Sequence, residues 1–280
     1  MSYKIILDSC GELTDKMKSS GRFSNVALSI EVGNYKIVDD ETFDQSKFLE
    51  AVASTTACPK SACPSPEQYM KAFDCKCERV YVVTLSEKLS GSHNSAVLAK
   101  KLYEEVNPNV KIEIFNSKSA SAGETLDALK IDALEQKGLS FDEVVEETKK
   151  YIDIISTNFV LEDLSFLERN GRLTGVKRLA ASILHIVPIM AAAPDGSIAQ
   201  LDQARGINKA MSKLIARVVE NCRQKNTVNL IISHCNCPER ALDFKDNLVS
   251  HLPNLNININ NTRGISSLYA GNKGIIVAYD

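Results

Sequence analysis

The sequence contains no apolar run that approaches the ~18 residues needed to span a bilayer. It also lacks an excess of either charge, because 33 Lys+Arg oppose 35 Asp+Glu and leave a formal net charge of -2. No electrostatic force therefore draws the whole chain to nucleic acid or to an anionic membrane. The amino terminus is typical of a strand over residues 4–7 and not of a signal peptide. We expect a cytoplasmic protein that binds no nucleic acid and is not integral to a membrane.

Several catalytic and nucleotide-binding motifs are absent as well. There is no G-x-x-x-x-G-K-[ST], G-x-G-x-x-G or G-x-S-x-G sequence, so a nucleotide-phosphate loop and an esterase elbow lack their usual signatures. The chain has only four histidines, which leaves few candidates for histidine-based catalysis.

The eight cysteines are dilute in a chain of 280 residues, and no secretion signal accompanies them, so reduced thiols are expected. The pairs Cys75/Cys77 and Cys235/Cys237 could together provide four thiolates for zinc. Structural zinc sites, however, usually separate the cysteines of a pair by about two to four residues, which is a wider spacing than here. We expect no metal and interpret the thiols as small buried or surface side chains.

What the chain does contain is an alternation of apolar runs with amphipathic stretches, which is typical of an α/β fold with βα units. At ~150 residues per domain, 280 residues correspond to about two domains. We place the boundary near residue 155, with domains at 1–155 and 156–280. The predicted strands cover residues 4–7, 79–86, 110–115, 158–161, 187–193, 198–204, 228–233 and 274–279, with another near 257. The predicted helices cover residues 65–73, 92–105, 119–136, 140–155, 164–170, 174–185, 207–222 and 238–252.

Local sequence patterns predict where some of these helices begin and where one hairpin turns. Ser65 with Gln68, and Ser140 with Glu143, have the spacing of capping boxes at helix starts. Residues 194–197 read Pro-Asp-Gly-Ser, which predicts the turn of a β-hairpin between the two flanking strands.

Polar loops rich in hydroxyl groups follow several of the predicted strands. In open α/β sheets, ligands lie beyond the carboxyl ends of the strands, where such loops fall. Backbone N–H groups at the following helix starts favour anions. The loops therefore indicate an anionic head group held by hydroxyls and amides, while the alternative is that the serines only cap helices and fill turns. They cover residues 8–11, 61–66, 89–95 and 116–121.

Short motifs occur in a defined order along the chain. They are Asp8-Ser9, Ser61-x-x-Pro64-Ser65-Pro66, Leu89-Ser90-Gly91-Ser92, Ser117-Lys118-Ser119-Ala120, Asp163-Leu164-x-x-Leu167-x-x-x-Gly171-Arg172-Leu173 and the stretch from Pro188 to Arg205. Each motif alone is unspecific. In this order they resemble the DegV family of fatty-acid-binding proteins, and the resemblance spans nearly the whole chain.

The resemblance implies a two-domain α/β fold, each domain a β-sheet flanked by helices, with the ligand near the interdomain cleft. It also implies a non-catalytic protein that binds one long-chain fatty acid, such as palmitate or oleate, and needs no cofactor. Residues 1–155 would supply the head-group loops and residues 156–280 the acyl-chain pocket. In bacteria with a fatty acid kinase, family members present the acyl chain to that kinase and receive the acyl phosphate, so such a kinase is the expected partner.

By motif position, the resemblance assigns the carboxylate-binding hydroxyls to Ser61 and Ser90. Further contacts with the head group or with a partner are implied for Gly91, His93, Arg172, Arg205 and Tyr269. For the two arginines, a solvated charge or an interdomain ion pair is an equal alternative. A histidine on a helix face, such as His93, is more often structural. No residue is assigned to catalysis or to a metal.

An acyl chain would supply most of the affinity, because burial of each methylene contributes ~0.8 kcal/mol, on the order of 10 kcal/mol for a long chain before ordering costs. A carboxylate held by neutral hydroxyls and amides, without a buried guanidinium, would remain nucleophilic toward a phosphoryl donor. The candidates for the acyl slot are apolar residues whose alternative role is ordinary core packing: Leu179, Ile183, Leu184, Ile186 and Ile189.

Two motifs depart from the family pattern, and both concern the head group. The usual Thr-Ser-Gln-Pro run reads Ser61-Ala62-Cys63-Pro64 here, which loses one hydroxyl and one carboxamide. The usual His-Thr-Gly-x-Gly loop reads Tyr269-Ala270-Gly271-Asn272-Lys273, so Tyr269 stands where the head-group histidine would be. A tyrosine hydroxyl can still donate a hydrogen bond. Kinase partnership and ligand identity are therefore open at this point.

Two other functions stay open on the sequence alone. The first is an enzyme on the same scaffold, related to phosphotransfer or hydrolytic, that acts on a small anionic substrate. A Ser90/His93 hydrolase would need a carboxylate to orient the histidine and an oxyanion site, and the sequence names neither. The second is a sensor whose lipid occupancy changes domain closure and partner binding.

Overall fold

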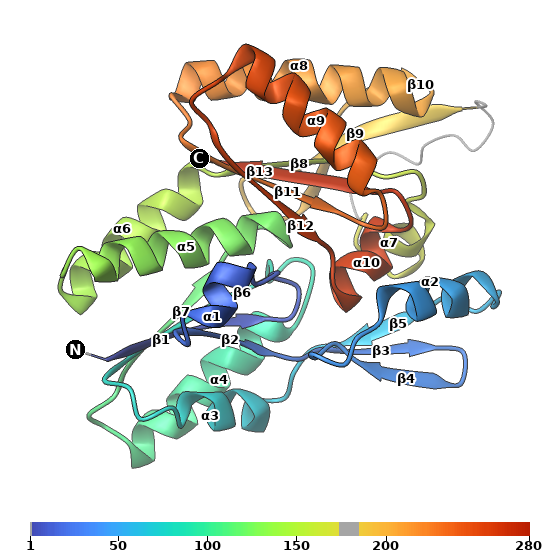
Figure 1. Cartoon of the computed structure of the whole chain (residues 1–280). Coiled ribbons are helices and arrows are strands. Elements are labelled where there is room, and N and C mark those ends of the chain that lie inside the picture. The colour runs from blue at the N-terminus through green and yellow to red at the C-terminus, as the bar shows by residue number, and fades with distance from the viewer. Residues whose placement is uncertain (1, 174–184) are drawn as a thin grey trace.

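A four-stranded parallel sheet forms the amino-terminal part of the fold (Figure 1). The computed structural model describes residues 2–173 and 185–280. The strands lie in the order β2-β1-β6-β7, with β1 (Tyr3–Asp8), β2 (Phe23–Val26), β6 (Arg79–Thr84) and β7 (Lys111–Asn116). All three pairings are parallel, so the carboxyl ends of the strands meet at one edge of the sheet. The hydroxyl-rich loops at residues 8–11, 89–95 and 116–121 follow that edge.

Helices cover both faces of this sheet, because successive side chains of a strand point to opposite sides. On one face Leu7 and Val83 pack against one group of helices, and on the other face Ile6 and Val82 pack against a second group. The first group comprises α1 (Asp15–Ser19), α5 (Ala122–Gln136) and α6 (Phe141–Ile154). The second comprises α3 (Pro66–Phe73) and α4 (Ser92–Val106).

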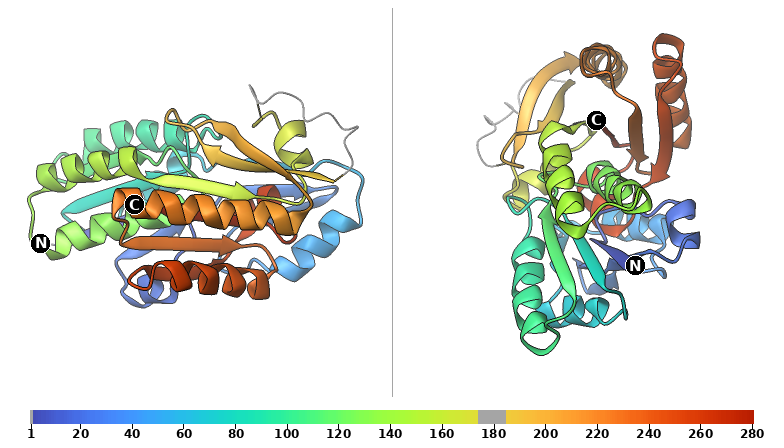
Figure 2. Two further views of the ribbon diagram at one scale, coloured as in Figure 1. Left: turned by 90° about the horizontal axis from the view of Figure 1, so that it is seen from above. Right: turned by 90° about the vertical axis from the view of Figure 1, so that its left-hand side faces the viewer.

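A six-stranded mixed sheet forms the carboxy-terminal part, in the order β10-β9-β8-β13-β11-β12. Its strands are β8 (Ser156–Val160), β9 (Ile186–Ala192), β10 (Ile198–Arg205), β11 (Asn229–His234), β12 (Asn256–Asn261) and β13 (Ile275–Tyr279). One face is covered by α8 (Ile207–Lys225) and α9 (Pro238–His251). On the other face, Ala122 and Leu126 of α5 contact Ile231 and Ala278, so α5 lies between the two larger sheets (Figure 2).

A small antiparallel sheet, in the order β4-β3-β5, projects from the amino-terminal part. It comprises β3 (Ser29–Val32), β4 (Tyr35–Val38) and β5 (Lys60–Ala62), and α2 (Gln45–Ala53) follows β4. Two short helices of the carboxy-terminal part, α7 (Ser165–Arg169) and α10 (Gly264–Ala270), contact each other, and α10 also contacts β3 and α2. The small sheet thereby contacts the other half of the chain.

The predicted α/β fold is confirmed, as are several local details. Both capping boxes form, at Ser65 and at Ser140. Residues 194–197 make the turn between the antiparallel strands β9 and β10. The small sheet, β2, α1, α2 and α10 were not predicted. The helix predicted over 174–185 lies outside the described residues, except for His185.

The two larger sheets draw on different parts of the chain, since one has strands within residues 3–116 and the other within residues 156–279. A domain boundary near residue 155 stays a prediction. Among the described residues, no helix is both long enough and apolar enough to cross a bilayer.

Candidate functional site

An apolar pocket lies where the loops of the amino-terminal sheet meet the carboxy-terminal sheet. It encloses about 710 Å³ of space between protein atoms, including its opening to solvent. Its walls come from the loops after β1, β6 and β7, from β8 and β13, from α7 and α10, and from the β9–β10 hairpin. The apolar part of the lining includes Leu85, Leu89, Phe159, Leu161, Ile265 and Ile276.

The alternation of side chains along β8 explains one wall of this pocket. Thr157, Phe159 and Leu161 line the pocket, whereas Val160 points the other way and packs in the core beneath α8. On the neighbouring strand β13, Ile276 pairs with Phe159 and also lines the pocket. One strand thus supplies both the pocket wall and the core.

A polar group lies beside the pocket, where three distant segments meet. The Oγ atom of Ser61 on β5 lies 2.9 Å from the hydroxyl of Tyr269 on α10, within hydrogen-bond distance. The guanidinium of Arg172 stacks 5.5 Å from the centre of the Tyr269 ring, and its Nε donates to the carbonyl of Leu89. Both Arg172 and Tyr269 line the pocket. A half-buried guanidinium therefore lies beside the two hydroxyls, at a residue that the family resemblance associates with the head group or a partner.

Ser90 and Gly91 lie next to Leu89, at the start of α4, but neither lines the pocket as described. The Oγ atom of Ser90 accepts a hydrogen bond of 3.2 Å from the backbone N–H of Ser92. Gly91 is exposed, and a Cβ atom at this position would lie 3.2 Å from Sγ of Cys63. The structure therefore brings Ser61, Arg172 and Tyr269 together and leaves Ser90 one residue away from the lining.

His93 contacts the body of the amino-terminal part. Its Nδ1 atom lies 3.2 Å from Oγ1 of Thr84, and burial lowers the pKa of its imidazole below the usual range. The structure shows no hydrogen bond between His93 and Ser90, the pair that a hydrolase would need. No observation on the described residues favours the hydrolytic alternative.

The other predicted ligand contacts lie away from the pocket or outside the described residues. Arg205 is exposed at the end of β10, seven residues or about 23 Å along the strand from the pocket-lining Ile198. Ile189 is buried in the core beside Leu214 of α8, so its alternative role in core packing is the one observed. Ile186 is half-buried and is not part of the lining. Leu179, Ile183 and Leu184 lie outside the described residues.

A buried carboxyl, Asp8, holds the loops around the pocket in place. Its oxygens accept hydrogen bonds from the backbone N–H groups of Cys10 (3.1 Å) and Leu85 (2.9 Å) and from the hydroxyl of Ser92 (2.6 Å). Burial raises the pKa of Asp8 to about 6, and burial beside Asp8 raises that of Glu124 well above its usual range. These bonds join the ends of β1 and β6 to the start of α4.

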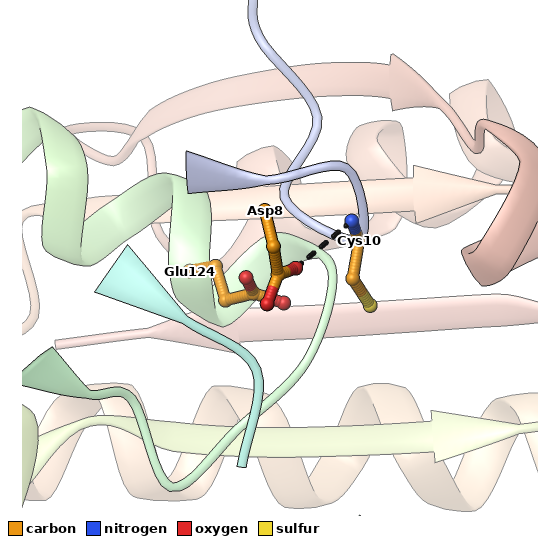
Figure 3. A group of neighbouring side chains, drawn as sticks. All are labelled: Asp8, Cys10 and Glu124. Atoms are coloured by element: carbon orange, nitrogen blue, oxygen red, sulfur yellow. Dashed lines mark hydrogen bonds between the residues drawn. The ribbon is translucent and has the colours of Figure 1, made fainter. Parts of the chain in front are cut away.

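Asp8, Cys10 and Glu124 also form the one group of possible metal ligands within 4.8 Å of one another among the described residues (Figure 3). The oxygens of Asp8 already accept three hydrogen bonds, and burial raises the pKa of the Cys10 thiol. Through these hydrogen bonds Asp8 has a structural role, because it joins the loops that surround the pocket. Cys75, Cys77, Cys235 and Cys237 are not gathered into a comparable group, so the alternative of a four-thiolate zinc site is not supported.

Two further buried carboxylates connect the two parts of the chain, and neither was foreseen from the sequence. Oε2 of Glu12 accepts hydrogen bonds from Ser121 Oγ (2.8 Å) and from Ser233 Oγ on β11 (3.1 Å). Burial raises the pKa of Glu12 to about 7. Because Ser121 lines the pocket, Glu12 fixes one pocket wall to the carboxy-terminal sheet.

Asp39, in the segment after β4, accepts hydrogen bonds from the backbone N–H groups of Gly264 (2.8 Å) and Ile265 (2.9 Å) at the start of α10. A Cβ atom on Gly264 would lie 2.6 Å from Cγ of Asp39, so this close approach requires glycine. Asp39 thereby positions the helix that carries Tyr269. The helix itself could have been found from Ile265, Leu268 and Tyr269, whose spacing is that of one helix face.

Comparison with known proteins identifies the family of the chain. A family model described as "Uncharacterised protein, DegV family" matches residues 2–280. The chain belongs to the DegV family. A DegV domain-containing protein of Streptococcus gordonii is 36% identical over 283 residues, covering 100% of this chain and 99% of that protein. The resemblance drawn from the ordered motifs is confirmed.

Solved DegV structures share the whole fold. A DegV family protein from Ruminococcus gnavus, refined with vaccenic acid, is 47% identical with a TM-score of 0.94, and the match covers 99% of each chain. The Fatty Acid Kinase (Fak) B3 protein of Streptococcus pneumoniae, loaded with linoleic acid, is 31% identical with a TM-score of 0.88, covering 100% of this chain and 99% of that one. Two related proteins of this fold therefore carry an unsaturated fatty acid.

Proposed function

We propose that this DegV protein binds one long-chain fatty acid in the apolar pocket and acts as a carrier rather than an enzyme. The observation that carries the proposal is the pairing of an almost wholly apolar pocket with a polar group of Ser61, Tyr269 and Arg172 beside it. The fatty acids in the two related structures support the same ligand class. Burial of each methylene contributes ~0.8 kcal/mol, so the tail supplies most of the affinity.

The carboxylate lies, in this proposal, at Tyr269 and Arg172, with Ser61 and the adjacent Ser90 as further hydroxyl donors. The phenol of Tyr269 replaces its hydrogen bond with Ser61 by one to the carboxylate, or donates to it while Ser61 supports the phenol. Two donor groups of Arg172 already bind the carbonyls of Leu89 and Asn170. The guanidinium is therefore fixed beside the site before a ligand arrives, which lowers the ordering cost of binding.

The proposed partner is a fatty acid kinase, which phosphorylates the presented carboxylate and returns the acyl phosphate. The name of the related Streptococcus pneumoniae protein supports this assignment. The exposed Arg205, far from the pocket, suits contact with a partner better than contact with the head group. We place this exchange in the cytoplasm and assign no cofactor or metal to the protein.

Both predicted domains contribute to the proposed ligand site. Residues 1–155 supply Ser61, Ser90 and the apolar Leu85 and Leu89, whereas residues 156–280 supply Arg172, Tyr269 and most of the acyl wall. The ligand then lies between the two domains.

Mass spectrometry of the purified protein tests the proposal directly. Native spectra followed by organic extraction are expected to show one fatty acid per chain, because a buried acyl chain survives purification. Delipidated protein is expected to take up palmitate or oleate at the same ratio. A protein that is empty and takes up neither acid contradicts fatty acid binding. Transfer of phosphate from ATP to the bound acid by an added fatty acid kinase tests the partner separately.

A further inference from the structure

Two cavities meet at a shared wall inside the protein. The apolar pocket is one of them. The second cavity is here called the outer groove. It is bounded by the loop after β7, the end of α6, the start of β8 and the carboxy-terminal half of α8. Its residues include Lys118, Asp153 and Lys225. Ser119, Thr157 and Ala192 line both cavities and thus form the wall between them.

A hydrogen bond closes this wall. Ser119 Oγ and Thr157 Oγ1 lie 2.7 Å apart, and each residue is only 5% exposed. Because the two hydroxyls satisfy each other, they present little polar surface, and the pocket stays apolar although serine and threonine line it. The wall therefore accepts contact with a hydrocarbon.

Packing against α5 holds the hydroxyls of Ser119 and Thr157 in position. A Cβ atom on Gly123 would lie 2.1 Å from Ser119 Oγ and 3.0 Å from Thr157 Oγ1, so the first turn of α5 lies directly against both hydroxyls. Ser117 Oγ donates to the carbonyl of Ser119 and accepts from its N–H. These contacts fix the Ser119 side of the wall.

The wall lies at the far end of the pocket from the proposed head-group site. Leu161 clusters with Leu167 and Tyr269, next to that site. Thr157 is four residues earlier on the same pocket-facing side of the strand, about 13 Å away. An acyl chain whose carboxylate is at Tyr269 and whose tail runs along β8 therefore ends at the wall.

We propose that the wall of Ser119, Thr157 and Ala192 sets the longest acyl chain that the pocket accepts, and that opening it lets longer chains extend into the outer groove. This inference rests on the proposed fatty acid binding and adds the structural basis of chain-length selection. The outer groove has the room for such an extension, with about 1610 Å³ of space including the solvent at its opening. Ala191, Ala192, Pro194 and Leu201 give it apolar surface for the tail.

Two opposite changes test the proposal on delipidated protein. The double variant Ser119→Gly, Thr157→Ala removes both hydroxyls and opens the wall, whereas Ala192→Leu thickens it. Competition between stearate and the longer behenate is expected to shift at least about tenfold toward behenate in the double variant, because each buried methylene strengthens binding about fourfold and two of the four extra methylenes of behenate already exceed tenfold. Ala192→Leu is expected to shift competition from stearate toward the shorter myristate.

Ser156→Ala is the matched control, because Ser156 precedes Thr157 on β8 and lines only the outer groove. It is expected to keep the wild-type preference. An unchanged preference in a folded double variant overturns the proposal, and so does a Ser156→Ala shift equal to that of the double variant. If the double variant fails to fold, Ala192→Leu decides, and the proposal is wrong if this variant binds stearate and myristate as the wild type does. A wild-type protein that takes up no fatty acid overturns fatty acid binding itself.

Discussion

The hydroxyl of Tyr269 lies 2.9 Å from Oγ of Ser61, although 208 residues separate the two in the sequence. Ser61 belongs to the small sheet of the amino-terminal half, and Tyr269 to a helix of the carboxy-terminal half. Both positions depart from the usual DegV motifs, in which threonine and histidine occur. The two departures meet in space, so both belong to the proposed head-group site.

Removal of the Tyr269 hydroxyl tests this site. Tyr269→Phe keeps the ring beneath the Arg172 guanidinium and removes only the hydrogen bond. We expect fatty acid affinity to fall about fivefold, which corresponds to a hydrogen bond of ~1 kcal/mol. Titration of the delipidated variant with oleate measures the effect. Tyr35→Phe, at a tyrosine that is 70% exposed on β4, is the matched control and is expected to bind like the wild type. Equal affinity of the two variants contradicts the assignment.

The charge at Arg172 is expected to contribute more than the tyrosine hydroxyl. Arg172→Gln removes a guanidinium that lines the pocket, and hydrogen bonds to charged groups contribute roughly 1.5–3 kcal/mol, so affinity is expected to fall at least about tenfold. Arg205→Gln removes an exposed arginine from the distant end of β10. It is expected to leave oleate binding unchanged and to slow acyl phosphate formation by the kinase. Equal losses of oleate affinity in both variants contradict this division of roles.

The sequence predicted the elements that follow simple periodic patterns and the loops that surround the site. Residues 79–86 and 92–105 become β6 and α4 almost as expected, because a buried apolar run and an amphipathic stretch are local signals. The sequence did not predict most of the residues that line the pocket. The β9 candidates were chosen for apolarity alone, but only packing decides whether Ile189 faces α8 or the ligand. Contacts such as Asp39 with Gly264 join residues 225 positions apart, and no local pattern encodes them.

Asp39 is expected to matter for stability and for binding together. Asp39→Asn replaces one of the two oxygens that accept N–H groups of α10 with an N–H donor, so we expect the free energy of unfolding in urea to fall by about 1–2 kcal/mol. Oleate affinity is expected to fall as well, because α10 carries Tyr269.

Asp44→Asn is the matched control, since Asp44 caps α2 through the N–H of Lys47. This control is expected to lower stability by about 1 kcal/mol or less and to retain affinity. Wild-type affinity and stability in Asp39→Asn would show that α10 needs no cap from Asp39.

Burial of Glu12 makes stability depend on pH in an unusual direction. Burial raises its pKa from 4.5 to about 7 in the folded protein, so between these values the folded state holds a proton that the unfolded state has released. Protonation therefore favours folding, and this contribution is fully present below about pH 4.5 and is lost as pH rises through about 7. The Glu12→Gln variant mimics the protonated carboxyl at every pH. We expect its free energy of unfolding to decline less than that of the wild type between about pH 5 and about pH 8.

Glu124→Gln tests the same linkage at a second buried acid. Burial beside Asp8 holds the pKa of Glu124 well above its usual range, so the folded chain releases this proton at a higher pH than the unfolded chain does. Protonation of Glu124 therefore also favours folding, and this contribution is lost as the pH rises. Urea unfolding at closely spaced pH values is therefore expected to show a smaller decline in the free energy of unfolding with rising pH for both variants, with the Glu12→Gln difference confined mainly to the range below about pH 7. Parallel curves for the wild type and Glu12→Gln across the interval would mean that Glu12 is ionised in the folded protein, held by Ser121 and Ser233 as a charged link between the two sheets.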